Sequence, residues 1–217
     1  GCSSLTSIAL PAGLTAIGSY AFRNSALASI VIPDGVNSIA QSTFSSTPLA
    51  QVTLPAGLTS IGHVAFDDCR SLTSIALPAG LTAIDSYAFR NSGLTSIVIP
   101  DGVILIADST FESCSSLAQV TIPSSVSFIG VRAFYGCSSL SITVPGTVLV
   151  IGTDAFSGTI GNALTVPECQ SDLGSKYGGT ERKRIAGSIY DSKYGGTKRK
   201  HIAVAVAGTK RIAGSKR

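Results

Sequence analysis

The chain has 217 residues, a formal net charge of +4, five cysteines and neither methionine nor tryptophan. Its longest apolar stretches, such as residues 103–107, are far shorter than the roughly 18 residues that a membrane-spanning helix needs, so no membrane span is expected. The only histidines, His63 and His201, are isolated, and there is no Cys-x-x-Cys pair and no glycine-rich phosphate loop before a helix. These absences argue against a metal site, a cofactor and a catalytic centre.

Charge divides the chain into two predicted domains. Residues 1–167 carry four arginines, no lysine and eight acidic residues, a net charge of −4, whereas residues 168–217 carry twelve basic and four acidic residues, a net charge of +8. Such a sharp change in sign predicts a domain boundary near residue 167.

Phenylalanine recurs through the first domain at intervals of 22 or 23 residues, and eight of the nine prolines recur at the same intervals. A fixed period in this range predicts a solenoid of about seven coils, because each repeat buries its apolar face only by stacking on its neighbours. The predicted structural core is the phenylalanine column Phe22, Phe44, Phe66, Phe89, Phe111, Phe134 and Phe156.

Within the first repeat, apolar and small polar residues alternate around Ile8 and Leu10, which predicts a short strand with one buried face. The Pro-Ala-Gly sequence that follows at residues 11–13 predicts a turn. Leu14 and Ile17 then return to the core ahead of the phenylalanine. We expect successive coils to stack as parallel strands roughly 4.8 Å apart.

A longer period overlies the short one. Residues 5–33 match residues 72–100 except at three positions, Gly18/Asp85, Ala26/Gly93 and Ala28/Thr95, so a block of three coils has been duplicated over 67 residues. Any surface that the first coil presents is therefore presented again by the fourth.

The recurring pattern Leu-x-x-Ile-x-Leu-Pro-x-x-Leu-x-x-Ile-Gly-x-x-Ala-Phe-x-x-Cys-x-x-Leu is nearly complete from Leu49 to Leu72. It resembles the BspA-like subclass of leucine-rich repeats over about residues 2–167. The resemblance implies a right-handed solenoid, mainly β, with a parallel sheet along one side and short turns or helical turns. It further implies a secreted or cell-surface location and a non-catalytic role in adhesion or protein binding, and it brings no catalytic residues. The coil ends offer a route to self-association.

Four cysteines, Cys2, Cys69, Cys114 and Cys137, share one slot of the repeat, which asparagine or serine fills in the other coils. We interpret the slot as structural, with the side chain bonding the turning backbone or filling a small buried space. A disulfide between Cys114 and Cys137 is conceivable, because they lie in adjacent coils, but no bridge is required. Asp67-Asp68 suggests either a cation site or, as we favour, a solvated turn.

The outward positions of the predicted strands form a flat stripe without charge or aromatic rings. We select it as a candidate protein-binding stripe, against the alternative of a solvated face on a spacer rod; its members are Ser7, Ser29, Val31, Gln51, Thr53, Ser74, Ser96, Val98, Gln119 and Thr121. A second candidate surface consists of Tyr20, Arg23, Tyr87 and Arg90, which the 67-residue duplication repeats.

The basic segment 168–217 has its own repeat, since residues 175–186 recur in closely related form as residues 192–203. Its composition of glycine, serine and charged residues predicts disorder. Two clusters could bind nucleic acid, another anionic surface or the acidic array of another copy: Arg182, Lys183, Arg184, Lys198, Arg199 and Lys200. The alternative function is therefore a scaffold whose basic tail does the binding.

Overall fold

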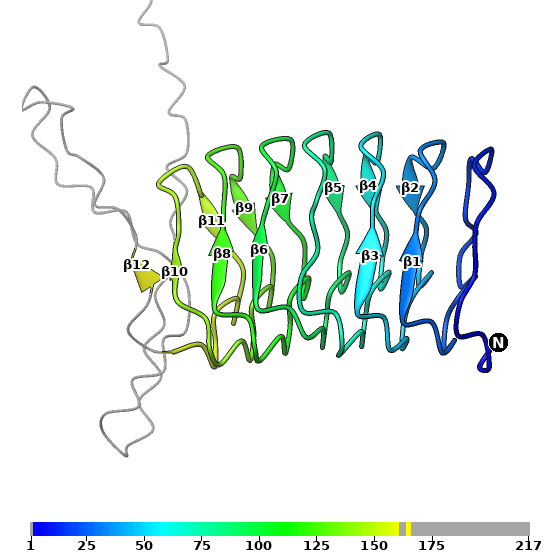
Figure 1. The fold of residues 1–217 in the computed structure, drawn as a ribbon. Coiled ribbons are helices and arrows are strands. Elements are labelled where there is room, and N and C mark those ends of the chain that lie inside the picture. The colour runs from blue at the N-terminus through cyan, green and yellow to red at the C-terminus, as the bar shows by residue number, and fades with distance from the viewer. Residues whose placement is uncertain (1, 161–163, 166–217) are drawn as a thin grey trace, which may run out of the picture.

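The computed structural model describes residues 2–160 and 164–165, which form a solenoid of stacked coils (Figure 1). No helix occurs among these residues. The N-terminal coil lies at one end of the stack, and β12 lies at the other. The expected parallel solenoid is confirmed, and its strands form two rows.

Row A contains the strands expected before each proline turn. Its members are β1 (Ser29–Val31), β3 (Gln51–Thr53), β6 (Ser96–Val98), β8 (Gln119–Thr121), β10 (Ile142–Thr143) and β12 (Leu164–Thr165). The pairs β1–β3, β6–β8 and β10–β12 are parallel and in register, as in Ser29 opposite Gln51, so equivalent repeat positions lie side by side.

Row B follows the proline turn in each coil and forms a second side of parallel strands. The sequence predicted a parallel sheet along one side only. Its members are β2 (Ser38–Ile39), β4 (Ser60–Ile61), β5 (Ala83–Ile84), β7 (Leu105–Ile106), β9 (Phe128–Ile129) and β11 (Val150–Ile151). These strands form two parallel sheets, in the orders β2-β4-β5 and β7-β9-β11. In β1 to β11 one isoleucine or valine of each strand points toward the core while its neighbours face out, the alternation expected of a strand with one buried face.

The phenylalanines occupy the third side of each coil, which we call the arc, and stack in one column through the core. Neighbouring ring centroids lie 5.3–5.6 Å apart, and the ring planes differ by only 2–14°. The five rings from Phe44 to Phe134 are fully buried, whereas Phe156 is only partly buried. Each inner ring therefore contacts a ring above it and a ring below it.

The arc backbone alternates between left-handed and right-handed conformations. In every coil the residues two before and two after the phenylalanine have positive φ, for example Tyr87 (61°) and Asn91 (55°). This alternation sends every second N–H to the next coil: Tyr87 N–H donates to the Asp108 carbonyl at 3.1 Å and Phe89 N–H to the Thr110 carbonyl at 2.9 Å. The arc thus carries its own ladder of bonds between coils, and the phenylalanine lies at its centre.

Replacing Phe89 with alanine is expected to lower the free energy of unfolding by about 3–5 kcal/mol, because it removes a fully buried ring and leaves a cavity between two others. Chemical denaturation measures the change. The matched substitution Phe156→Ala, at a partly exposed ring, should cost less. A loss below about 1 kcal/mol at residue 89 would contradict the importance of the column.

Val64 holds one of the left-handed positions (φ 60°) although its side chain is β-branched, a combination that costs roughly 1–2 kcal/mol. Val64→Asn should therefore raise the free energy of unfolding by about 1 kcal/mol, since asparagine tolerates this conformation. Thermal denaturation would detect the gain. Val64→Thr, which keeps the branch, is the control and should give no gain; an equal gain in both variants would rule out relief of backbone strain.

Candidate functional site

The candidate stripe runs along the outer side of row A. All ten of its side chains are exposed, and the register places Val31 beside Thr53 and Ser96 beside Gln119. Eight of the ten lie on strands β1, β3, β6 and β8. Ser7 and Ser74 occupy the equivalent position in coils one and four, where residues 7–9 and 74–76 run alongside without pairing as strands.

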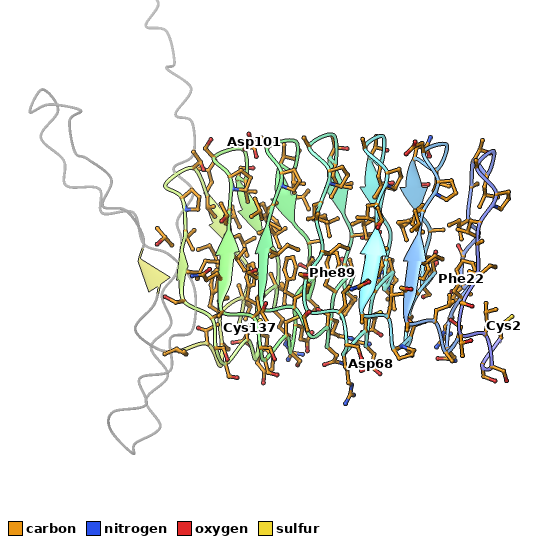
Figure 2. The ribbon with its side chains drawn as sticks, in the orientation of Figure 1. Cys2, Phe22, Asp68, Phe89, Asp101 and Cys137 are labelled. Atoms are coloured by element: carbon orange, nitrogen blue, oxygen red, sulfur yellow. The ribbon has the colours of Figure 1, made fainter. Side chains whose placement is uncertain are left out.

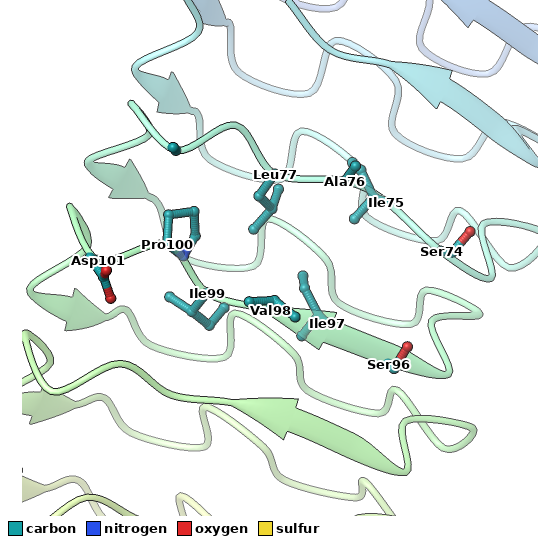
Figure 3. A pocket seen from close by; sticks show the side chains of 11 residues that line it. Ser74, Ile75, Ala76, Leu77, Ser96, Ile97, Val98, Ile99, Pro100 and Asp101 are labelled. Atoms are coloured by element: carbon teal, nitrogen blue, oxygen red, sulfur yellow. The ribbon is translucent and has the colours of Figure 1, made fainter. Parts of the chain in front are cut away.

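Two grooves interrupt the stripe, and the sequence analysis did not foresee either. The central groove, between residues 74–76 and β6, encloses about 530 Å³ (Figure 3); its lining residues are Ser74, Ile75, Ala76, Leu77, Ala79, Ser96, Ile97, Val98, Ile99, Pro100 and Asp101. The N-terminal groove, between residues 7–9 and β1, encloses about 860 Å³; it is lined by Ser7, Ile8, Ala9, Leu10, Ala12, Ser29, Ile30, Val31, Ile32, Pro33, Asp34, Gln51 and Thr53.

The two grooves are copies of each other. Every residue that lines the central groove has an identical counterpart 67 residues earlier in the N-terminal groove, to which Gln51 and Thr53 also contribute. Three ring-to-ring steps of 5.3–5.5 Å separate equivalent coils, so the grooves lie roughly 16 Å apart on one face of the solenoid.

Missing hydrogen bonds between coils open the central groove. Within the described chain, no hydrogen bond joins residues 74–76 to β6, and on row B none joins β5 to β7. On row A the nearest connection is the Thr95 N–H, which donates to the Thr73 carbonyl at 3.0 Å. The two coils are therefore joined through the arc and at Thr95, and they lack hydrogen bonds along the strands themselves.

The groove has apolar walls and polar ends. Ile75, Leu77 and the exposed Val98 supply apolar surface, and in Figure 3 Asp101 lies at the opposite end from Ser74 and Ser96. Val98 is 65% exposed, and Val31, its counterpart, is 66% exposed. This arrangement suits an apolar segment with a cationic group at one end.

Tyrosine and arginine pair on the arc at the second candidate surface. Arg23 lies over the Tyr20 ring at 5.8 Å from its centroid, and Arg90 lies over the Tyr87 ring at 5.1 Å. A third pair was not predicted from the sequence: Arg132 and Tyr135 exchange the two slots, and the Arg132 guanidinium still lies 5.3 Å from the centroid of the Tyr135 ring. The sequence could have revealed this pair through the two repeat positions that it occupies, two residues before and one residue after the phenylalanine, because tyrosine and arginine fill them in either order.

Both carboxylates of Asp67-Asp68 are occupied by guanidinium groups. Arg90 donates to the two oxygens of Asp67 at 2.8 and 3.1 Å, and Arg70 donates to Asp68 at 2.7 Å. The hydrogen bonds that Arg90 donates to Asp67 raise the pKa of the Arg90 guanidinium, which therefore stays charged. Nowhere in the described ranges do three or more histidine, cysteine or acidic side chains gather as metal ligands.

The cysteine slot is buried in coils three, five and six, and its thiols bond the backbone. Cys69, Cys114 and Cys137 donate to the carbonyls of Phe44, Phe89 and Phe111 at 3.0–3.2 Å. Cys2, Cys69, Cys114 and Cys137 are all free thiols, so the conceivable 114–137 disulfide is not formed. Burial raises the pKa of Cys69 and of Cys114 to about 11, and raises that of Cys137 further.

Row B carries an exposed apolar patch that the sequence analysis also missed. Leu105, Phe128 and the half-buried Val150 are in register on neighbouring strands, with the exposed Ile104 and Leu149 beside them. Earlier coils hold Ser38, Ser60 and Ala83 in the outward slot of this row. In the sequence, continuous apolar runs such as residues 103–106 could have indicated this patch.

The basic clusters at residues 182–184 and 198–200 lie outside the described residues, as does the predicted domain boundary at residue 167. In the part of the chain that the structure describes, no helix is long and apolar enough to cross a membrane.

The coil geometry and the recurring slots define a leucine-rich repeat solenoid. The sequence matches the BspA type leucine rich repeat region in six copies, over residues 1–59 and 37–162. The chain belongs to this family, which confirms the resemblance drawn from the sequence.

Solved structures that are similar to this chain include two bacterial leucine-rich repeat proteins. One is a leucine rich cell surface protein from Faecalibacterium prausnitzii A2-165, at 38% identity with a TM-score of 0.62, covering 69% of this chain and 44% of that one. The other is a leucine-rich repeat protein from Bacteroides ovatus, at 27% identity with a TM-score of 0.59, covering 66% of this chain and 44% of that one. This chain therefore spans less than half the length of either. No curated protein matches it.

The buried thiols should resist alkylation in the native protein. In a Cys169→Ser variant at pH 8, iodoacetamide is expected to label Cys2 rapidly and to leave Cys69, Cys114 and Cys137 unmodified, because burial keeps their thiols protonated. Adding denaturant should expose the three buried thiols, so that mass spectrometry then detects four labelled cysteines. Rapid native labelling of any buried thiol would contradict its place in the core.

The same thiols make stability depend on pH. Unfolded thiols ionise near 9.0, whereas native Cys69 and Cys114 stay protonated to about 11. Between these values the unfolded state binds fewer protons, so the free energy of unfolding should fall as pH rises from 9 to 11. A Cys69→Ser/Cys114→Ser variant should show a weaker decline.

Proposed function

We propose that the chain is a non-catalytic protein-binding or adhesion module, secreted or displayed on a cell surface, and that it binds through the outer stripe of row A. Membership of the BspA type family supports a binding role, and the similarity to a cell surface protein of F. prausnitzii supports the location.

The twin grooves carry this proposal. Two concave sites with the same lining residues lie roughly 16 Å apart on one face, and each has apolar walls that a partner could cover. A stripe that lacks tryptophan, tyrosine and arginine has few strong anchors. Two linked weak sites nevertheless bind far more tightly than one, because the second contact is intramolecular once the first has formed. Repetition thus compensates for modest individual contacts.

Substitutions in the grooves test the proposal. Because Val31 and Val98 are largely exposed, Val31→Asp and Val98→Asp should leave the fold intact while placing a charge beside an apolar wall. Binding to a panel of immobilised cell-surface proteins, followed by interferometry on each positive, should weaken about tenfold for each single variant and by roughly 100-fold for the double variant. Raising salt from 50 to 300 mM should weaken wild-type binding by no more than about fivefold, since the stripe is uncharged and each groove contributes a single carboxylate, Asp34 or Asp101.

Ser38→Asp, at an exposed position of row B, is the matched control and should bind like the wild type. If the double groove variant retained full affinity, or if binding fell steeply with salt, the stripe would not be the contact surface.

A further inference from the structure

Row B changes from a polar to an apolar surface between coils four and five. In coils two to four its outward strand position holds serine or alanine, and the position before it holds asparagine or threonine. In coils five to seven the same two positions form what we call the lateral patch, whose members are Ile104, Leu105, Ser127, Phe128, Leu149 and Val150. Its strands β7, β9 and β11 lie next to one another in Figure 1.

The lateral patch is exposed, continuous and uncharged. Ile104 is 61% exposed and Leu149 is 59% exposed, and Leu105 and Phe128 also face solvent. No charged residue occurs in residues 103–107, 126–131 or 147–153, so nothing repels a second apolar surface. The patch amounts to a few hundred Å², the size at which a contiguous apolar area on a monomer marks an interaction site.

The lateral patch is symmetric about β9. The parallel register aligns Leu105, Phe128 and Val150 across the three strands, so the residues that precede them are level as well. The central strand carries one aromatic ring, and each outer strand carries two branched aliphatic side chains. Such a surface is complementary to itself, which is the property that a twofold dimer interface requires.

The symmetry also selects the orientation of the second copy. A twofold axis along β9 places Phe128 over Phe128 of the second copy, Leu105 over its Val150 and Ile104 over its Leu149. The solenoids then run in opposite directions and overlap at coils five to seven. If they ran in the same direction, Phe128 would lie over Ser127 of the second copy, and the polar strands of coils two to four would also be buried. Only the antiparallel arrangement covers the apolar residues without those polar ones.

The available area suits a weak dimer. Two patches of this size and their polar rim together bury close to the roughly 1,000 Å² that separates specific interfaces from transient ones. Association is therefore expected in the micromolar range.

We propose that a second copy of this chain packs face to face on the lateral patch, with the two solenoids antiparallel and Phe128 at the twofold axis. The contact closes on itself at two chains, whereas contacts through the coil ends would extend into longer rods. Row A lies on another side of each coil, so the dimer presents both stripes. The inference does not depend on the proposed function, because dimerisation is measured without a partner.

Sedimentation equilibrium of the full chain over about 1–300 µM tests the contact. The average mass should rise with concentration from 22.0 kDa toward twice that value and no further. Phe128→Asp, which places two carboxylates face to face at the axis, should raise the dissociation constant at least tenfold. Ser38→Asp, at an exposed position of row B in coil two, is the matched control and should dimerise like the wild type. A wild type that stays monomeric, or that grows beyond a dimer, would overturn the proposal.

A pair of opposite charges tests the antiparallel orientation and keeps the proposal falsifiable if Phe128→Asp fails to fold. Ile104→Lys and Leu149→Asp should each weaken dimerisation about tenfold, since each places a charge against an apolar side chain. The double variant Ile104→Lys/Leu149→Asp should recover to within about threefold of the wild type, because lysine then faces aspartate of the other copy twice. Within one copy the two positions lie two strands apart, roughly 10 Å, too far to form an ion pair.

A double variant that dimerises more weakly than either single variant would rule out the antiparallel dimer, because like charges then face each other. The outcomes are also separable from those of the stripe experiment. Val31→Asp/Val98→Asp should leave dimerisation unchanged, and Phe128→Asp should leave each groove intact. Loss of dimerisation without loss of groove-dependent partner binding would therefore leave the proposed function standing.

Discussion

Stacking of one aromatic ring per coil is the contact on which the solenoid depends. The centroid spacing of 5.3–5.6 Å exceeds the roughly 4.8 Å rise between hydrogen-bonded strands, so neighbouring rings are offset sideways by about 2.5 Å. Offset stacking is the preferred arrangement of aromatic pairs. It allows the rings and the strands to repeat at the same distance along the solenoid axis. Figure 2 shows Phe22 and Phe89 among the side chains inside the coils. A single coil has no such partner, which is why repetition itself is the source of stability.

The parts of the fold that could be predicted are those whose residues repeat visibly every 22 or 23 positions in the sequence. The strand before each proline has three alternating positions, enough to identify Ile30 and Ile97 as inward. The strands of row B have two residues each, too few for a period to appear. The left-handed positions gave only a weak signal, because serine, tyrosine, valine, aspartate and arginine hold most of them, whereas asparagine holds only residues 24 and 91 and glycine only residues 136 and 158. Their conformation follows from the bonds between coils and not from local preference.

The stripe could be predicted and its grooves could not, for a related reason. Alternation alone places Val31 and Val98 outward, whereas a groove arises from hydrogen bonds that fail to form between two particular coils. The sequence did contain hints. Alanine, a poor strand former, replaces valine or threonine at residues 9 and 76. In the next coil the Pro-Asp-Gly turn brings Gly102 so close to the preceding coil that a Cβ there would lie 2.7 Å from the Leu81 carbonyl oxygen.

A solenoid can tolerate such openings because its junctions are nearly independent. Each hydrogen bond contributes only about 0.5–1.5 kcal/mol net, whereas a buried phenylalanine contributes about 3–5 kcal/mol. The junction at the central groove lacks strand bonds on both rows yet keeps the Phe89–Phe111 contact at 5.6 Å and the arc ladder beside it. Stability is thus concentrated on the arc, which allows the strand side to lose its hydrogen bonds locally. Duplication of the three-coil block then placed the same groove twice on one face of an array whose core is almost uniform.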